Sequence, residues 1–109
     1  MSQDRKERMM SEICQHTANF FHYHSNGKSL ITVTGCDLAP SLKNATVYIT
    51  VLPTELEREA LDFAKRQSGQ IRHYINDHVK MGRVPYIDVM IDGGEKNRQK
   101  IAEIIVKNK

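Results

Sequence analysis

The fold of this chain is decided by residues 31–92, which read ITVTGCDLAPSLKNATVYITVLPTELEREALDFAKRQSGQIRHYINDHVKMGRVPYIDVMID. The pattern predicts two β-strands, a long helical segment interrupted at Ser68-Gly69, a basic turn and a third strand. Lys, Arg and His side chains recur along the helical part, and no catalytic constellation is embedded in it. A small α/β unit with a cationic helix favours the binding of a nucleic acid over the conversion of a metabolite.

Three segments show the alternation of apolar and polar residues that is typical of half-buried β-strands. The first spans Leu30 to Cys36, the second spans Asn44 to Leu52, and the third follows a turn formed by Gly82 to Pro85. The apolar positions of the second and third strands are Ala45, Val47, Ile49, Val51, Ile87, Val89 and Ile91. Each apolar face must be covered, which predicts a helical layer on one side of the sheet.

Four helical segments are available for that layer. Asp4 to about His24 is amphipathic, with apolar residues at steps of three and four. Thr54-Glu55-Leu56-Glu57 has the sequence of a capping box, in which the hydroxyl of the first residue accepts the N–H of the fourth, and predicts a second helix. That helix is expected to kink at Ser68-Gly69, because glycine disfavours a helix by about 1 kcal/mol relative to alanine. A short last helix would carry Ile101, Ile104 and Ile105.

The predicted order is therefore helix, strand, strand, helix, kink, helix, strand, helix. This is an α+β fold in which a three-stranded sheet is covered by helices. A chain of 109 residues is long enough for one hydrophobic core, so we expect a single domain over residues 1–109.

Positive charge is concentrated in one part of the sequence. The whole chain has a formal net charge of only +3, but between residues 65 and 83 five cations accompany a single acid, Asp77. These cations are the candidate RNA-binding residues Lys65, Arg66, Arg72, Lys80 and Arg83. Arg72 is the first choice, because a guanidinium can bind a phosphate through two parallel hydrogen bonds. A solvated helix face or, for Arg72, an intramolecular salt bridge is the structural alternative.

Little in the sequence indicates a metal, a cofactor or a membrane. Cys14 and Cys36 have no CxxC or metal-ligand spacing and fit a reducing compartment, although two cysteines could form one bridge. His16, His22 and His24 share the first helix without the usual pairing of ligands four residues apart, so no metal site and no cofactor are expected. The N-terminus lacks the apolar core of a signal peptide and no apolar run approaches a membrane span, which predicts a cytoplasmic protein.

The order of elements is that of type II KH domains, and several segments extend the likeness. They are Arg5–Met9 at the start of the first helix, Ile31–Gly35, Ser41–Ile49, Ser68–Arg72 at the kink, and Met81–Pro85 before the third strand. Together, in this order and spacing, they resemble the ribosome-binding factor A family over roughly Arg5 to Ile101. The chain departs from the family where Ser25-Asn26-Gly27-Lys28 replaces an Asp-Pro-Arg element and where Gln67-Ser68-Gly69 replaces Ala-x-Gly.

The resemblance implies a factor that binds the free small (30S) ribosomal subunit and its 16S rRNA. It implies assistance in late subunit maturation, including processing of the rRNA 5′ end, with most importance for growth in the cold and with no catalysis. A ribosome-maturation GTPase is implied as a further partner. We expect a monomer, because the sequence shows no strong dimer seam.

An ordinary KH domain holds nucleotides with a GxxG loop, and this chain has only Gly69 at the helix junction. We therefore expect the kinked helix pair to lie along folded rRNA, with Arg5 and Arg8 of the first helix extending the surface. The alternatives are a generic KH-like RNA-binding module, a protein-interaction module that docks a partner through Phe20 and Phe21, and a small enzyme of the acyl-phosphate hydrolase type. The hydrolase would need a glycine-rich anion cradle before a helix, which the sequence does not contain.

Overall fold

The sheet has three strands in the order β1–β2–β3, with β2 (Asn44–Leu52) in the centre. The computed structural model describes residues 2–24, 27–79 and 82–94. β1 (Leu30–Leu38) pairs with β2 in antiparallel orientation, and β3 (Tyr86–Ile91) pairs with β2 in parallel. β2 has the predicted bounds. β1 continues two residues beyond the predicted end at Cys36, because Asp37 and Leu38 still pair with β2.

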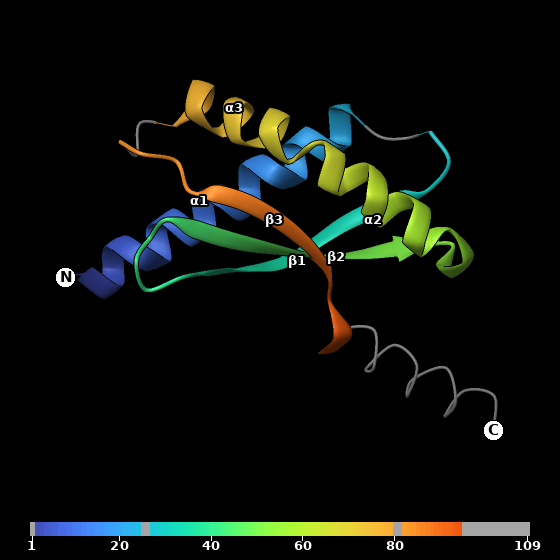
Figure 1. Cartoon of the computed structure of the whole chain (residues 1–109), viewed down its shortest axis with the longest axis horizontal. Coiled ribbons are helices and arrows are strands. Elements are labelled where there is room, and N and C mark those ends of the chain that lie inside the picture. The colour runs from blue at the N-terminus through green and yellow to red at the C-terminus, as the bar shows by residue number, and fades with distance from the viewer. Residues whose placement is uncertain (1, 25–26, 80–81, 95–109) are drawn as a thin grey trace.

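The three helices lie on one face of this sheet (Figure 1). They are α1 (Ser2–Tyr23), α2 (Glu57–Arg66) and α3 (Ser68–His78). The residues that the strands turn toward them form the core and include Ala45, Val47, Ile49, Val51, Ile87 and Val89. The predicted α+β, KH type II-like fold is thus confirmed through β3, whereas the predicted last helix with Ile101, Ile104 and Ile105 lies outside the described residues. None of the described helices has the length and apolar character needed to cross a membrane.

α1 buries a wide face, and this overturns one functional prediction. Phe20 and Phe21 are only 4% and 3% exposed, so they are core residues and the prediction that they dock a partner is wrong. Their rings meet edge to face at 5.7 Å, and Phe20 also meets Tyr74 of α3 at 5.8 Å. The helix packs against both the sheet and α3, which is why two consecutive residues can be buried.

The predicted capping box at Thr54 is not formed. Residues Thr54–Leu56 instead make a turn of 3-10 helix, η1, after Pro53, and the N–H of Glu57 donates to the backbone carbonyl of Thr54. That N–H is the group that the Thr54 hydroxyl was expected to satisfy, so a backbone acceptor has taken the place of the side chain. α2 begins at Glu57 without a side-chain cap.

The break between α2 and α3 lies at Gln67, one residue before the predicted Ser68-Gly69. Hydrogen bonding continues across it: the N–H of Gln67 donates to the carbonyls of Phe63 and Ala64, and the carbonyl of Gln67 accepts the N–H of Ile71 at 2.8 Å. The chain therefore changes direction without losing its helical character. This bend keeps both helices on the sheet, with Ala60, Ala64, Ile71 and Ile75 all fully buried.

Candidate nucleic-acid interface

A hollow of about 460 Å³ lies between α3 and the segment that leads into β3. Its lining residues are Gly69, Arg72, His73, Asn76, Gly82, Arg83 and Val84. Two of these side chains carry a positive charge, a third can acquire one, and none of the seven is acidic. Lys80, which is also a candidate RNA-binding residue from the sequence, lies outside the described residues.

The core of the protein fixes both walls of this hollow. On α3, Arg72 and Asn76 directly follow the buried residues Ile71 and Ile75, so the anchored isoleucines set both polar side chains on one flank of the helix. On the other wall, Gly82 takes a φ of +80°, a left-handed conformation that glycine adopts without strain, and Val84 returns the chain to the core. One wall of the hollow is therefore a packed helix, and the other is a short segment that the buried Val84 anchors to the core.

Arg72 is held in place by uncharged groups. Its Nε donates to the carbonyl of Val84 at 3.1 Å, and its guanidinium carbon lies 4.4 Å from the centre of the Tyr86 ring. Cation–π contact and a single hydrogen bond orient the planar group but do not neutralise its charge. The two terminal amino groups of Arg72 form no hydrogen bond or ion pair with any described residue. The predicted salt bridge of Arg72, the structural alternative, is not found there either.

Two further polar side chains accompany Arg72 at the hollow. Arg83 is exposed and has no recorded ion pair with any described residue. His73 is exposed too, with its Nε2 at 3.4 Å from Asp77 one turn along α3. Arg72 and Arg83 thus present N–H donors around one hollow, which is the chemistry that binds an oxyanion such as phosphate, whereas the Nε2 of His73 faces Asp77.

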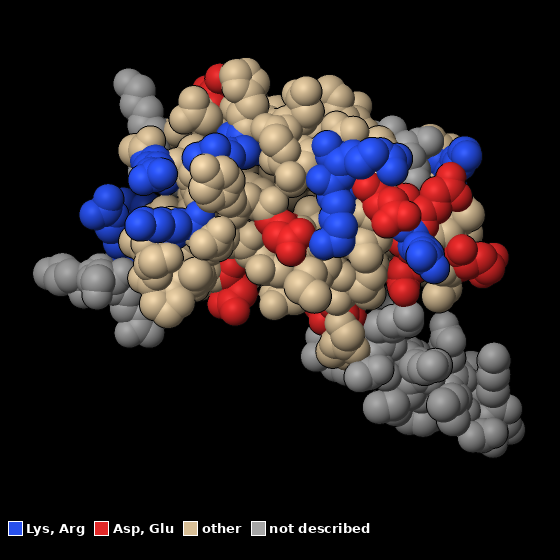
Figure 2. Space-filling model, in the orientation of Figure 1, with Lys and Arg blue, Asp and Glu red and all other residues tan. Residues whose placement is uncertain are grey.

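The two cations predicted on α2 do not line the hollow. The Nζ of Lys65 donates to Oδ1 of Asp88 on β3 at 2.9 Å, so its charge is compensated within the protein. Arg66 is exposed at the end of α2 and has no ion pair recorded with the described residues. Glu57 and Glu59 also belong to the first turn of α2, and Figure 2 shows acidic side chains interleaved with the basic ones in this part of the surface.

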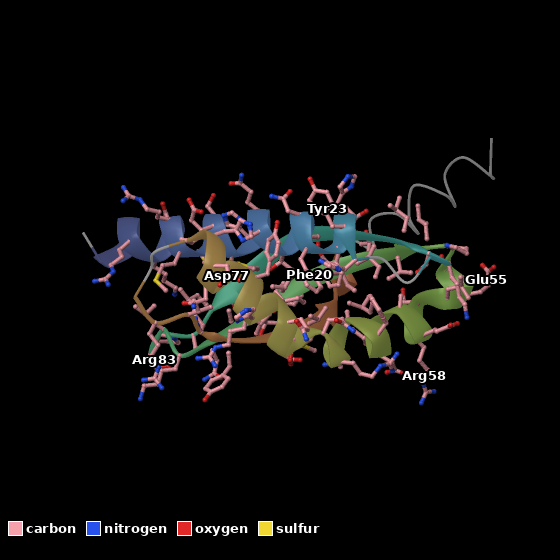
Figure 3. All side chains as sticks on the ribbon, turned by 90° about the horizontal axis from the view of Figure 1, so that it is seen from above. Phe20, Tyr23, Glu55, Arg58, Asp77 and Arg83 are labelled. Atoms are coloured by element: carbon pink, nitrogen blue, oxygen red, sulfur yellow. The ribbon has the colours of Figure 1, made fainter. Side chains whose placement is uncertain are left out.

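Arg5 and Arg8 are exposed on the first turns of α1 and are also absent from the hollow. Figure 3 shows α1 along one side of the molecule and Arg83 on the opposite side. Of the predicted kink residues, Gly69 lines the hollow and Ser68 is half-buried at the start of α3. The fold therefore brings Arg72 and Arg83 together and keeps the other described candidates apart from them.

Two features of this region were not predicted. Tyr86, at the start of β3, is 58% exposed and supports the guanidinium of Arg72. On the far flank of α3, the Tyr74 ring stacks on His78 at 4.1 Å, and the ring of His16 from α1 lies 5.7 Å from His78. This aromatic cluster packs α1 against α3. The only sequence signal for it is the four-residue step from Tyr74 to His78. No group of three metal-ligating side chains occurs among the described residues.

Comparison with known sequences identifies related proteins. The family described as ribosome-binding factor A matches residues 5–105. Ribosome-binding factor A of Caldanaerobacter subterraneus is 32% identical over 79 residues, which cover 72% of this chain and 65% of that protein. The factor of Desulfitobacterium hafniense is 32% identical over 76 residues, 69% of this chain and 61% of its own length, so both matches span slightly less than two thirds of the relatives. A Clostridium botulinum factor is 26% identical across 96% of this chain and 91% of its own.

Solved structures share the fold. The crystal structure of ribosome-binding factor A from Thermus thermophilus superposes with a TM-score of 0.72 at 18% identity, covering 79% of this chain and 93% of that one. A homology model of the Thermus thermophilus factor, fitted into the cryo-EM map of its complex with 30S, gives 0.65 at 18% identity and covers 74% and 88%. With a family match that extends over nearly the whole sequence and a fold in agreement with it, the chain belongs to the ribosome-binding factor A family.

Proposed function

We propose that this chain binds the free small ribosomal subunit through its 16S rRNA, and that the hollow between α3 and β3 receives an rRNA phosphate. The observation that carries the proposal is the state of Arg72, which is oriented by Val84 and Tyr86 while its charge is left uncompensated. A guanidinium held in this way loses little conformational freedom when it binds, and its two terminal amino groups match two phosphate oxygens.

The neighbouring side chains extend the same chemistry. Arg83 lies across the hollow from α3 and supplies a second positive charge, and the exposed Asn76 amide can donate a further hydrogen bond. Donors on a rigid surface recognise folded RNA by its shape and backbone rather than by its bases. The outlying contacts to the rRNA would then be made by Lys65, Arg66, Arg5 and Arg8. Lys80 is proposed as a further contact because it is close in sequence to residues that line the hollow.

The wider role follows from the family. A relative from Thermus thermophilus forms a complex with 30S, and we extend this association to the present chain. On this view it assists late maturation of the subunit, including processing of the 16S rRNA 5′ end, as a monomeric cytoplasmic factor that catalyses no reaction and needs no cofactor. Growth in the cold would depend on it most, and a ribosome-maturation GTPase would release it.

Co-sedimentation with purified 30S subunits, 50S subunits and 70S ribosomes over a salt series tests the proposal. The expected result is selective retention by free 30S subunits that weakens as salt rises, because each phosphate contact displaces counterions. The double variant Arg72→Ala/Arg83→Ala should lower the affinity by tenfold or more and should reduce the slope of log affinity against log salt by roughly 1 for each lost contact.

A control for the loss of one positive charge, to be compared with Arg72→Ala and Arg83→Ala as single variants and with the double variant, is available at the other end of the molecule. Arg58 of α2 is exposed and lies far from Arg83 in Figure 3, so Arg58→Ala removes one positive charge away from the hollow. It should retain nearly full binding. Equal retention of the wild-type chain by all three particles would contradict subunit selectivity, and equal losses in Arg58→Ala and the double variant would contradict the assignment of the hollow.

A further inference from the structure

The two cysteines of this chain, far apart in sequence, meet where α1 crosses β1. The Sγ of Cys36 on β1 donates to the carbonyl oxygen of Met10 on α1 at 3.2 Å. In an α-helix that carbonyl also accepts the N–H of the residue four positions later, which here is Cys14. The sulfur of Cys36 is therefore seated beside the helical turn that carries Cys14, so the two thiols are neighbours across the contact between α1 and β1.

This contact makes the two thiols unequal. The hydrogen bond from Cys36 lowers the pKa of Cys14 to about 7, although partial burial acts in the opposite direction. The pKa of Cys36 is raised far above its usual range, first because its proton bonds to the Cys14 sulfur once that thiol is ionised, in place of the Met10 carbonyl, and second because of burial. Near neutral pH a large fraction of Cys14 is thiolate, the nucleophilic form, and Cys36 keeps its proton.

We propose that Cys14 and Cys36 are a peroxide-reactive thiol pair that closes into an intramolecular disulfide between α1 and β1. Both residues are half-buried, so a molecule as small as hydrogen peroxide can reach them while larger disulfides have poor access. The chain has only these two cysteines. The pair is independent of the rRNA hollow, since neither cysteine lines it.

The reaction proceeds in two balanced steps. The Cys14 thiolate attacks one peroxide oxygen and breaks the O–O bond, giving a sulfenic acid on Cys14 and hydroxide, which is protonated to water. The Cys36 sulfur then attacks the Cys14 sulfur and displaces the sulfenic oxygen as a second water. Two thiols are oxidised to one disulfide and one peroxide is reduced to two waters.

The first step also prepares Cys36 for the second. The main reason for its raised pKa is the hydrogen bond to the sulfur of Cys14, and that thiolate no longer exists once Cys14 is a sulfenic acid. Cys36 then loses its proton more readily and becomes the attacking group.

Hydrogen peroxide added to the reduced full-length chain tests the proposal. Intact mass spectrometry should show a monomer lighter by two hydrogens, with both thiols protected from alkylation until a reductant is added. The rate of alkylation of Cys14 by iodoacetamide should have a midpoint near pH 7. Recovery of only disulfide-linked dimers, or of sulfinic acid without a disulfide, would overturn the proposal.

Three variants separate the roles of the two thiols. Cys36→Ser keeps a hydrogen-bond donor beside Cys14, so the midpoint should stay near pH 7 and dimedone should trap the sulfenic acid. Cys36→Ala removes the donor, and the midpoint should move toward the ordinary cysteine value of about 8.5. Cys14→Ser should slow oxidation of the remaining thiol at least tenfold. The same midpoint in Cys36→Ser and Cys36→Ala, or equal oxidation rates in Cys14→Ser and Cys36→Ser, would show that the thiols do not act as a pair.

Discussion

α2 has three lysine and arginine residues and α3 has one, and the two helices hold these positive charges differently. On α2, Lys65 is tied to Asp88, and Glu59 accepts a hydrogen bond from Lys28 at 3.0 Å, so acids and bases of this helix compensate charges elsewhere in the protein. On α3, Arg72 is held by a carbonyl and an aromatic ring, which fix its position and leave its charge available. The number of basic residues in a helix is therefore a poor guide to which of them can bind an anion.

The distinction also explains why the two helices can lie on one sheet and still differ in function. An exposed ion pair such as Lys65 with Asp88 contributes little to stability, up to about 1 kcal/mol, and its main effect is to lower the local potential. A guanidinium that stacks on an aromatic ring keeps its positive charge uncompensated, and its terminal amino groups stay free to bind an anion. The main proposed rRNA contact thus belongs to the α3 end of the sheet. α2 contributes its buried alanines to the fold, and its Lys65 and Arg66 remain outlying contacts.

The largest expected effect on affinity for 30S subunits comes from a substitution that keeps the positive charge at residue 72 and replaces the planar guanidinium. Arg72→Lys abolishes the paired amino groups and the planar contact with Tyr86, so affinity for 30S subunits should fall by tenfold or more, or about 1.5–3 kcal/mol for hydrogen bonds to a charged group. Arg66→Lys, on exposed α2, is the matched control and should change affinity less than twofold. Similar small changes in both variants would mean that only net charge matters at the hollow.

Much of the fold could be predicted because it depends on local periodicity. The alternation in residues 44–52 gave the bounds of β2 and its buried face, and the glycine in the helical segment located the break to within one residue. At Thr54, the side-chain hydroxyl and the backbone carbonyl are two acceptors that compete for the N–H of Glu57. The sequence motif does not determine which of them accepts it. The burial of Phe20 and Phe21 depended on α3 as a second packing partner, which the helical period of α1 alone does not reveal.

The candidate site was less predictable, because its properties arise from contacts between distant segments. Lys65 and Asp88 are 23 positions apart, and Arg72 and Val84 are 12 apart. Neither contact has a local sequence signal, so the sequence ranked Arg72 first only by the chemistry of its guanidinium and did not show which of the five cations are compensated. The meeting of Cys36 with the α1 turn at Met10 spans 26 positions and was hidden for the same reason.

A second change should sharpen the comparison by separating folding from binding on α3. Gly69 lies within the helix, and a Cβ added there would meet no atom within 4 Å, so Gly69→Ala should stabilise the protein by about 0.5–1 kcal/mol. Because Gly69 also lines the hollow, the added methyl should hinder close approach of an rRNA backbone and weaken binding several-fold. Urea unfolding and co-sedimentation measure the two effects. If Gly69→Ala stabilises the protein and leaves binding to 30S subunits unchanged, Gly69 is not part of the rRNA contact surface.

The smallest effect should come from releasing the compensated charge on α2. Asp88→Asn breaks the ion pair with Lys65 while its side-chain oxygen can still accept the N–H of Val89, so the free energy of unfolding should change by less than about 1 kcal/mol. We expect binding to 30S subunits to tighten about two- to threefold at low salt and to return to the wild-type value at high salt, where exposed charges are screened. Asp62→Asn on α2 removes the same charge without freeing Lys65 and should tighten binding less. An equal gain in the two variants would assign the effect to net charge alone and would place Lys65 outside the rRNA contact.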